Sequence, residues 1–155
     1  DCSRLTTITL PKNLTSIGSY AFSSCSSLTE ITLPKNVTSI ANWAFSRCSS
    51  LKEINIPDSV TSIDSWAFDG CSALENIIVS EPNRVYEPNS TTILHHAMQT
   101  GNKNLITNLL TSYPGINLNT LDNNSFSPLT SYLRKIRADA NELTLQQKRE
   151  AVEFF

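Results

Sequence analysis

Residues 25–45 read CSSLTEITLPKNVTSIANWAF, and nearly the same pattern occurs 23 positions earlier and 23 positions later. The cysteines that begin each unit are Cys2, Cys25, Cys48 and Cys71. Three full units and the opening of a fourth therefore lie within residues 1–79. Self-similarity at a fixed period of about 20–50 residues is typical of repeat proteins, in which each unit stacks on its neighbours.

Within each unit the apolar residues keep their places while the residues between them vary. The segment Ile31-Thr32-Leu33 puts two apolar side chains on one face of a strand, and Pro34 ends the strand. The segment from Val37 to Ile40 is expected to return along another side of the coil. The triplet Trp43-Ala44-Phe45 closes the unit, and we expect a short helical or 3₁₀ piece there. One unit cannot bury its apolar side chains alone, so we expect continuous ladders through stacked units.

The pattern Cys-Ser-Ser-Leu-x-x-Ile-x-Leu-Pro-x-x-Val-x-x-Ile-x-x-x-Ala-Phe resembles the BspA-type leucine-rich repeat, over residues 1–79. The resemblance implies a solenoid with one parallel strand in each 23-residue coil. Proteins of this type are surface adhesins or secreted effectors of bacteria and surface proteins of parasitic protists. The resemblance therefore also implies a role in binding other proteins.

The period stops after Val79, and residues 80–90 contain turn-forming residues that indicate a connector. A helical period follows. One amphipathic helix is predicted from Leu94, Ala97 and Met98, and a second helix is predicted from Leu105 to Leu110. Gly101 and Asn102 are expected to separate the two helices.

The run Thr92-Ile93-Leu94-His95-His96-Ala97 is similar to the start of an ankyrin repeat, with Ile93 at a position where that family has proline. A second, more divergent unit begins at Ser127-Pro128-Leu129, and its second helix is expected at about residues 145–155. The fold class that we predict is an α+β repeat protein. It has a short leucine-rich-repeat solenoid at 1–79, a connector at 80–90 and ankyrin-like helical hairpins at 91–155.

Composition excludes several classes of function. The net charge is −2, and no basic patch stands out, so nothing favours nucleic-acid binding. No apolar run reaches the roughly 18 residues of a membrane span. The start, Asp1-Cys2-Ser3-Arg4, lacks the regions of a signal peptide and resembles the middle of a repeat. We therefore expect that the chain is part of a longer protein.

The cysteine spacing does not match a zinc site of the short-spaced kind, in which paired cysteines are two to four residues apart. Equivalent cysteines in stacked coils have parallel Cβ directions, which do not suit a disulfide. We predict a ladder of four buried free thiols. His95 and His96 have no third ligand at a suitable spacing, so no metal or other cofactor is predicted. In the ankyrin-like interpretation His95 is a structural hydrogen-bonding residue.

The sequence shows no Gly-x-Ser-x-Gly turn, no Gly-rich phosphate loop and no His-Glu-x-x-His motif. Glu30 and Glu53 occupy equivalent sites on adjacent strands, about 5 Å apart at the backbone, so a glycosidase-like carboxylate pair is conceivable. Repetition of one surface position is the simpler explanation. We predict that the chain is not an enzyme.

The outward-facing strand positions vary while the inward positions stay constant, which suits a binding face. They are either partner-binding residues or merely solvated strand positions. These candidate residues are Thr7, Thr9, Glu30, Thr32, Glu53, Asn55, Asn76 and Ile78. Trp43 and Trp66 recur at the position of Tyr20, so a packing ladder on the convex side is favoured over a binding hot spot.

The function that we predict is a non-catalytic protein–protein interaction module of a secreted effector or surface protein, with a protein partner. The alternative is a structural cap or scaffold that recruits substrate for a catalytic domain outside this chain. Unpaired cysteines favour secretion into a reducing host cytosol, and the cell surface is the alternative location.

Overall fold

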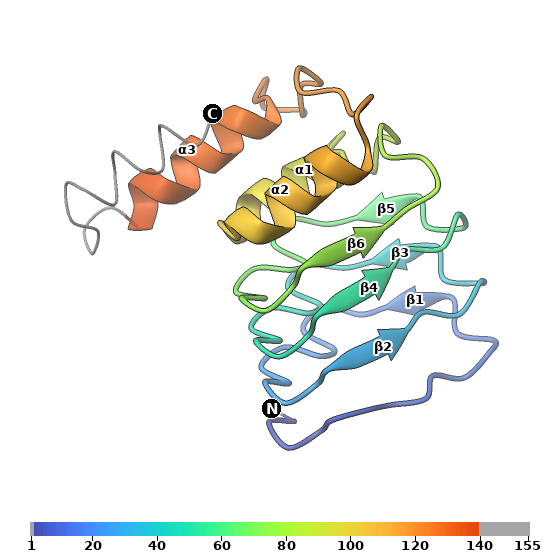
Figure 1. Cartoon of the computed structure of the whole chain (residues 1–155). Helices are drawn as coiled ribbons and strands as arrows, with labels where there is room; N and C mark the ends of the chain where they lie inside the picture. The colour runs from blue at the N-terminus through green and yellow to red at the C-terminus, as the bar shows by residue number, and fades with distance from the viewer. Residues whose placement is uncertain (1, 140–155) are drawn as a thin grey trace.

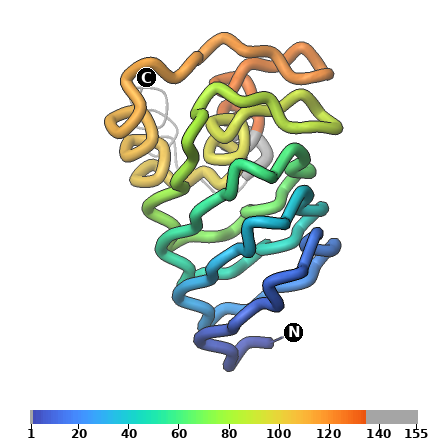
Figure 2. Tube along the Cα trace, turned by 90° about the vertical axis from the view of Figure 1, so that its right-hand side faces the viewer, coloured from blue at the N-terminus to red at the C-terminus, as the bar shows by residue number. Residues whose placement is uncertain are grey.

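The computed structural model describes residues 2–139, with side chains through Arg134. Two short parallel sheets form two sides of a stack of coils, and three helices lie on the C-terminal end of the stack (Figure 1). The N-terminus lies at the opposite end. In the view from the side, the coils are stacked in the order of the sequence, from blue at the N-terminus to green, and the helices lie beyond the last coil (Figure 2).

The first sheet contains one strand from each of three coils: β2 (Glu30–Thr32), β4 (Glu53–Asn55) and β6 (Asn76–Ile78). The strands are parallel, in the order β2-β4-β6. Residues 23 apart are partners, so Ile31 lies beside Ile54 and Ile54 lies beside Ile77. These central isoleucines are buried, and the residues before and after each of them point outward, as the alternation predicts.

The second sheet comes from the Val-x-x-Ile segments. It consists of β1 (Ser16–Ile17), β3 (Ser39–Ile40) and β5 (Ser62–Ile63), parallel and in that order. The isoleucine of each strand is buried, and its serine faces outward. The predicted return segment is therefore a short strand, and the core lies between the two sheets.

Backbone hydrogen bonds join neighbouring coils outside the strands as well. The amide of Thr29 donates to the carbonyl of Thr6 at 3.1 Å, and the amide of Glu75 donates to the carbonyl of Lys52 at 2.8 Å. The first coil has fewer of these bonds, and Thr7 and Thr9 lie in an irregular segment rather than in a strand. The strand predicted at the Ile-x-Leu segment of every coil is therefore absent from the first one, although that coil contributes β1 to the other sheet.

Aromatic ladders run through the stacked coils. Phe22 and Phe45 are 5.3 Å apart between ring centroids, and Phe45 and Phe68 are 5.7 Å apart, with rings inclined by only 6° in both pairs. Leu28, Leu51 and Leu74 are fully buried beside them. Each ring and each leucine is therefore covered by its equivalents in adjacent coils, which is the ladder packing that the repeat predicts.

The aromatic-Ala-Phe triplets form turns, so the expectation of a short helical or 3₁₀ piece is wrong. Tyr20, Trp43 and Trp66 each have a positive φ, of 59°, 59° and 62°. This left-handed conformation is uncommon for bulky residues. With this backbone conformation, the amides two residues later point toward the next coil. Phe22 N donates to Ala44 O and Phe45 N donates to Ala67 O, both at 2.8 Å. A helix would direct these amides back along their own coil instead.

The cysteines form the predicted ladder only in part. Cys25, Cys48 and Cys71 are free and buried, whereas Cys2 is free but exposed. The thiols of Cys48 and Cys71 donate to the carbonyls of Phe22 and Phe45, each at 3.1 Å. Cys2 lies in the first of the described coils, where no other described coil covers its thiol. The prediction of four buried thiols is therefore wrong for Cys2.

The helices are α1 (Ile93–Thr100), α2 (Lys103–Ser112) and α3 (Pro128–Asp139). Gly101, in the left-handed conformation at φ 70°, ends α1, as the sequence predicts. Asn102 caps α2 by accepting a hydrogen bond from Leu105 N at 3.2 Å. The helix α1 packs against both α2 and α3. The further helix expected at residues 145–155 lies outside the described residues.

The helix α2 covers the exposed edge of the last strand. Side chains from α2 and from the residues at its two ends take the place of a further coil. They bond to backbone groups in β6 and in the residues beside it. Asn102 and Asn108 donate to the carbonyls of Leu74 and Glu75 at 2.6 and 2.9 Å. The Tyr113 hydroxyl accepts from Val79 N at 3.1 Å and donates to Val79 O at 3.0 Å. Side chains therefore supply hydrogen-bond partners for backbone groups at this edge of the sheet.

The segment 80–90 also contacts the solenoid. Ile63 N donates to Glu87 O, and Glu87 N donates to Thr61 O, both at 3.1 Å. Tyr86 is buried, and the Arg84 guanidinium donates to the carbonyl of Val60 at 3.2 Å. This segment thus continues the β1-β3-β5 side of the stack. The division of the chain at residues 79 and 90 stays a prediction.

The thiols offer a direct test of the stacking. We expect one thiol, that of Cys2, to react rapidly with a thiol reagent under native conditions, and Cys25, Cys48 and Cys71 to react only on unfolding. Burial, followed by the neighbouring thiols, raises the pKa of Cys25, which lowers its fraction of reactive thiolate further. Mass spectrometry after a short labelling pulse measures this. The Cys2→Ser variant should lose the rapid phase, and more than one rapid thiol in the native wild type would contradict the fold.

Candidate interaction surface

The outward-facing strand residues form two rows. Register places Glu30 beside Glu53 and Glu53 beside Asn76, and it places Thr32 beside Asn55 and Asn55 beside Ile78. All of these are exposed except Asn76, which is half-buried. Thr7 and Thr9 are exposed in the first coil. The structure thus brings the predicted candidates to one face, and their role in binding stays a prediction.

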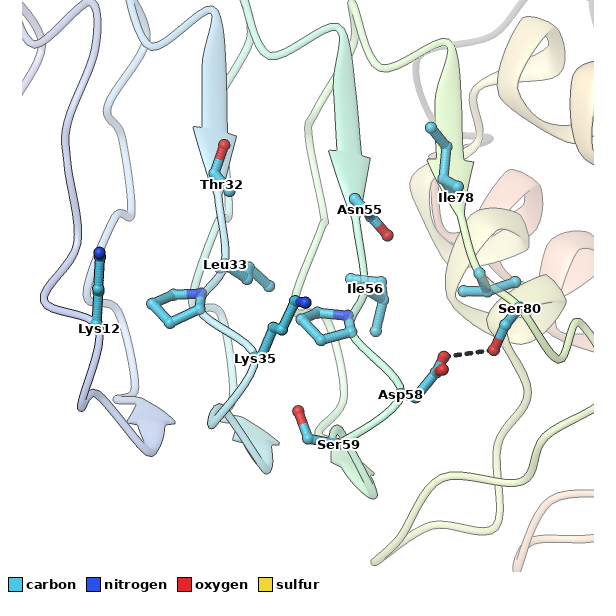
Figure 3. A pocket seen from close by; sticks show the side chains of 13 residues that line it. Lys12, Thr32, Leu33, Lys35, Asn55, Ile56, Asp58, Ser59, Ile78 and Ser80 are labelled. Atoms are coloured by element: carbon cyan, nitrogen blue, oxygen red, sulfur yellow. Dashed lines mark hydrogen bonds between the residues drawn. The ribbon is translucent and has the colours of Figure 1, made fainter.

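A groove runs across the coils at the carboxyl ends of β2, β4 and β6, with a volume of about 900 Å³ (Figure 3). Thr32, Asn55 and Ile78 lie along it. Leu33, Ile56 and Val79 line it beyond the strand ends, together with Pro34 and Pro57. We call this feature the strand-end groove. The lining is largely aliphatic, and Ile78 is 41% exposed although it is apolar. An exposed apolar strip of this kind is a candidate contact surface for another protein.

The strand-end groove is basic in its N-terminal part. Lys12 and Lys35 line it at equivalent repeat positions, whereas Asp58 stands where a third lysine would be. Asp58 accepts a hydrogen bond from the Ser80 hydroxyl (Figure 3). Among residues 2–134, neither lysine has an acidic side chain within ion-pair distance. The charge along the groove therefore changes from positive to negative.

A second hollow of about 540 Å³ continues the groove toward the first coil. The two hollows share Lys12, Thr32 and Pro34, and the second also contains Thr7, Thr9 and Glu30. Most of the predicted strand-face residues therefore line one continuous depression. The sequence reasoning missed Lys12, Lys35 and the two prolines, although the repeated Pro-Lys-Asn segment at 11–13 and 34–36 was a signal for them.

The paired carboxylates do not form an enclosed site. Glu30 and Glu53 are partners in adjacent strands, but both side chains are exposed on an open sheet face. Nothing there excludes water or places a third reactive group. Among the residues that the structure describes, no cluster of three or more His, Cys, Asp or Glu side chains could hold a metal ion.

His95 has the structural role that was predicted for it. Its Nδ1 accepts from the backbone N–H of Thr92 at 3.1 Å, and its Nε2 lies 3.0 Å from the carbonyl of Phe126. The side chain thereby joins the start of α1 to the loop before α3. Burial lowers the pKa of His95, which favours the neutral ring that accepts at Nδ1 and donates at Nε2.

His96 joins the helices to the aromatic ladder of the solenoid. Its ring meets Phe68 and Tyr86 edge-on, each at 6.4 Å between centroids. Its Nε2 lies 2.9 Å from the Thr91 hydroxyl, and its Nδ1 has no hydrogen-bond partner among the described residues. Burial lowers the pKa of His96 to about 3. The ring is therefore neutral and serves packing.

Comparison with known families agrees with this geometry. The model of the BspA type leucine rich repeat region matches residues 1–127, in 6 copies. The chain belongs to the BspA-type leucine-rich repeat family. The matched range extends beyond residue 79 and spans the segment 80–90 and the first two helices. Leucine-rich repeat proteins commonly bind proteins through the extended surface that their stacked repeats create, and typically lack catalytic activity. No curated protein matched the sequence.

Solved structures of leucine-rich repeat proteins resemble the BspA-type chain. A leucine rich cell surface protein from Faecalibacterium prausnitzii is 40% identical, with a TM-score of 0.50, over 56% of this chain and 23% of that one. A protein from Bacteroides ovatus is 39% identical, with a TM-score of 0.45, over 47% and 21%. One from Eubacterium ventriosum is 28% identical, with a TM-score of 0.48, over 66% and 24%. The chain thus spans between a fifth and a quarter of these structures.

BspA-type repeats are often found in cell-surface proteins. In the described part of this chain, no helix has the length and apolar composition that crossing a membrane requires.

The buried histidine predicts how stability depends on pH. In the folded chain His96 stays neutral down to a pKa of about 3, whereas the unfolded chain takes up a proton near 6.5. The contribution of His96 to stability is therefore complete above pH 6.5 and is lost as the pH falls from 6.5 toward 3. At about pH 5 the loss is on the order of 2 kcal/mol.

Urea unfolding at neutral pH and at about pH 5 measures this loss. The His96→Leu variant should lose less stability on acidification than the wild type by about 2 kcal/mol, even if it is less stable overall. Carboxylates affect both proteins equally, so the difference isolates the histidine. An equal pH dependence in the two proteins would show that His96 is not buried as a neutral ring.

Proposed function

We propose that the chain is a non-catalytic protein–protein interaction module, and that its partner binds in the strand-end groove and on the adjacent strand face. The observation that carries this proposal is the continuous depression across four coils. Its apolar lining recurs from coil to coil, whereas its exposed residues differ. A constant framework with variable exposed positions suits selective recognition of a partner.

The chemistry of the groove indicates the kind of partner. Covering Ile78 and the rings of Pro34 and Pro57 removes apolar surface from water, which contributes about 1 kcal/mol or more for Ile78 alone. Lys12 and Lys35 favour acidic side chains on the partner at the N-terminal end of the groove. The partner that fits is a protein segment with apolar residues beside a short acidic run.

Two observations bear on where the module works. Membership of the BspA-type family supports the cell surface, and one similar structure is named a cell surface protein. The four free cysteines support a reducing compartment such as a host cytosol that receives a secreted effector. We favour the host cytosol for the parent protein and keep the cell surface as the alternative.

A structural role of the helices is a second candidate function. The ankyrin-like interpretation of residues 91–155 is supported by the bonds of His95 to Thr92 and Phe126. In this proposal the helices close the exposed end of the solenoid through Asn102, Asn108 and Tyr113. The capped module would act as a scaffold that recruits substrate for a catalytic domain elsewhere in the parent protein.

Peptide selection tests the interaction surface. A random-peptide library selected on the wild-type chain should yield sequences with acidic residues beside apolar ones. Their affinity for a variant that combines Lys12→Glu, Lys35→Glu and Ile78→Asp should fall at least about tenfold, equivalent to about 1.4 kcal/mol. Fluorescence anisotropy with a labelled peptide measures the change.

The variant Arg4→Glu with Lys52→Glu serves as the control, because it also reverses two basic side chains and neither residue lines the groove. Its affinity should differ little from that of the wild type. Peptides that bind the groove variant and the control equally well would contradict the proposed surface, as would a selection that enriches no acidic and apolar sequences.

The capping role is tested by removing side-chain bonds to the sheet edge. Asn108→Ala with Tyr113→Phe leaves the backbone groups of Glu75 and Val79 without partners, and we expect a loss of about 2 kcal/mol in unfolding free energy. Asn104→Ala, on an exposed position of α2, is the control and should change stability little. Deletion of residues 91–155 should cause aggregation, and a soluble, equally stable 1–90 fragment would contradict this role.

A further inference from the structure

The charged side chains of the strand-end groove follow an order along the stack of coils. Lys12 and Lys35, from the first two coils, line its N-terminal part, and Asp58, from the third coil, follows them (Figure 3). All three side chains are exposed. Glu81 lies beside Asp58 at the C-terminal end of the groove. One half of the groove is therefore basic, and the other half is acidic.

The acidic half keeps a net negative charge. Glu81 is paired with Arg84, whose Nε lies 3.4 Å from the carboxylate. The Asp58 carboxylate accepts from the Ser80 hydroxyl, which carries no charge. Within residues 2–134, Asp58 and the two lysines have no side chain of opposite charge within ion-pair distance. These three charges are therefore available to a partner.

A surface with this order of charges is complementary to itself. A second copy, related to the first by a twofold axis across the stack, presents the same charges in the opposite order. When the axis passes between the second and third coils, Lys35 of each copy lies opposite Asp58 of the other copy. Lys12 then lies opposite Glu81. Opposite charges meet along the whole contact, and the two copies use the same surface, as in most protein dimers.

The apolar lining of the groove suits the same arrangement. Pro34 of one copy lies opposite Pro57 of the other. Ile78, which is 41% exposed, lies opposite the first coil, where the half-buried Leu10 borders the continuation of the groove. Contact between the copies therefore removes apolar surface from water. The acidic half of this groove itself has the apolar residues and the acidic charges that the proposed partner requires.

The carboxylates of Glu30 and Glu53 limit how far the contact extends. In the twofold arrangement they would face each other as like charges. They lie two residues before Thr32 and Asn55, which is about 7 Å farther from the groove along each strand. The contact is therefore centred on the strand ends rather than on the middle of the strand face.

We propose that the strand-end groove joins two copies of this chain in an antiparallel twofold dimer, held by reciprocal pairs of Lys35 and Asp58. The inference rests on the proposed function, because it names the partner of the same groove. The contact is small, and ion pairs that stay exposed to water contribute little. We therefore expect a weak dimer, with a dissociation constant on the order of 0.1 mM.

Sedimentation of the whole chain at concentrations from about 10 μM to about 1 mM tests the proposal. We expect a monomer–dimer equilibrium that weakens severalfold when the salt concentration rises from about 50 to about 500 mM, because exposed charges are screened. The variant Arg4→Glu with Lys52→Glu, which is changed outside the groove, should dimerise as the wild type does.

Charge reversals show which residues face each other. Lys35→Glu alone or Asp58→Lys alone places like charges at both pairs, so each should raise the dissociation constant at least about tenfold. An equimolar mixture of these two variants should associate as the wild type does, because each variant supplies the charge that the other requires. Recovery in the mixture would also show that both variants are folded.

Three results would overturn the inference: a chain that stays monomeric at about 1 mM, a dimer that neither single reversal weakens, and a mixture that does not recover. The selected peptides test the proposed function separately. A monomeric chain whose peptides fail to bind the groove variant would keep the proposed function and lose only the dimer. Peptides that bind the groove variant as they bind the wild type would contradict the proposed function and, with it, the dimer contact.

Discussion

Every feature of this protein depends on backbone hydrogen bonding between coils that are offset by 23 residues. An amide in one coil finds its carbonyl in the next, as Thr29 does with Thr6 and Glu75 does with Lys52. This constraint requires each coil to have the same length and the same shape. Side chains at equivalent positions are then forced into contact, so Phe22, Phe45 and the other recurring interior positions must carry groups that stack on their own equivalents.

The same constraint creates a problem at the last coil, whose outward amides and carbonyls have no further coil to bond. In this chain, side chains form these hydrogen bonds in place of the backbone of a further coil. Asn108 and Tyr113 bond to Glu75 and Val79, and His96 meets the Phe68 ring edge-on where the parallel stack stops. The helices are thus joined to the solenoid through both its polar edge and its apolar core.

Candidate sites arise where the repeat changes rather than where it holds. The strand-end groove gains its change of charge because Asp58 follows Pro57, whereas Lys35 follows Pro34. There the regular framework supplies the surface, and a single departure from the pattern supplies the chemistry. A protein built in this way can change its ligands without changing its fold.

The sequence by itself determined the period, the inward residues of each coil, the outward strand face and the ends of the first two helices, because these follow from spacing and local propensity. It also predicted the hydrogen-bonding role of His95. Only the tertiary structure decided that Trp43 adopts a left-handed turn, that Cys2 is exposed, and that Lys12 and Pro57 border one groove. These outcomes depend on which coil lies beside which backbone group, and spacing along one chain does not contain that information.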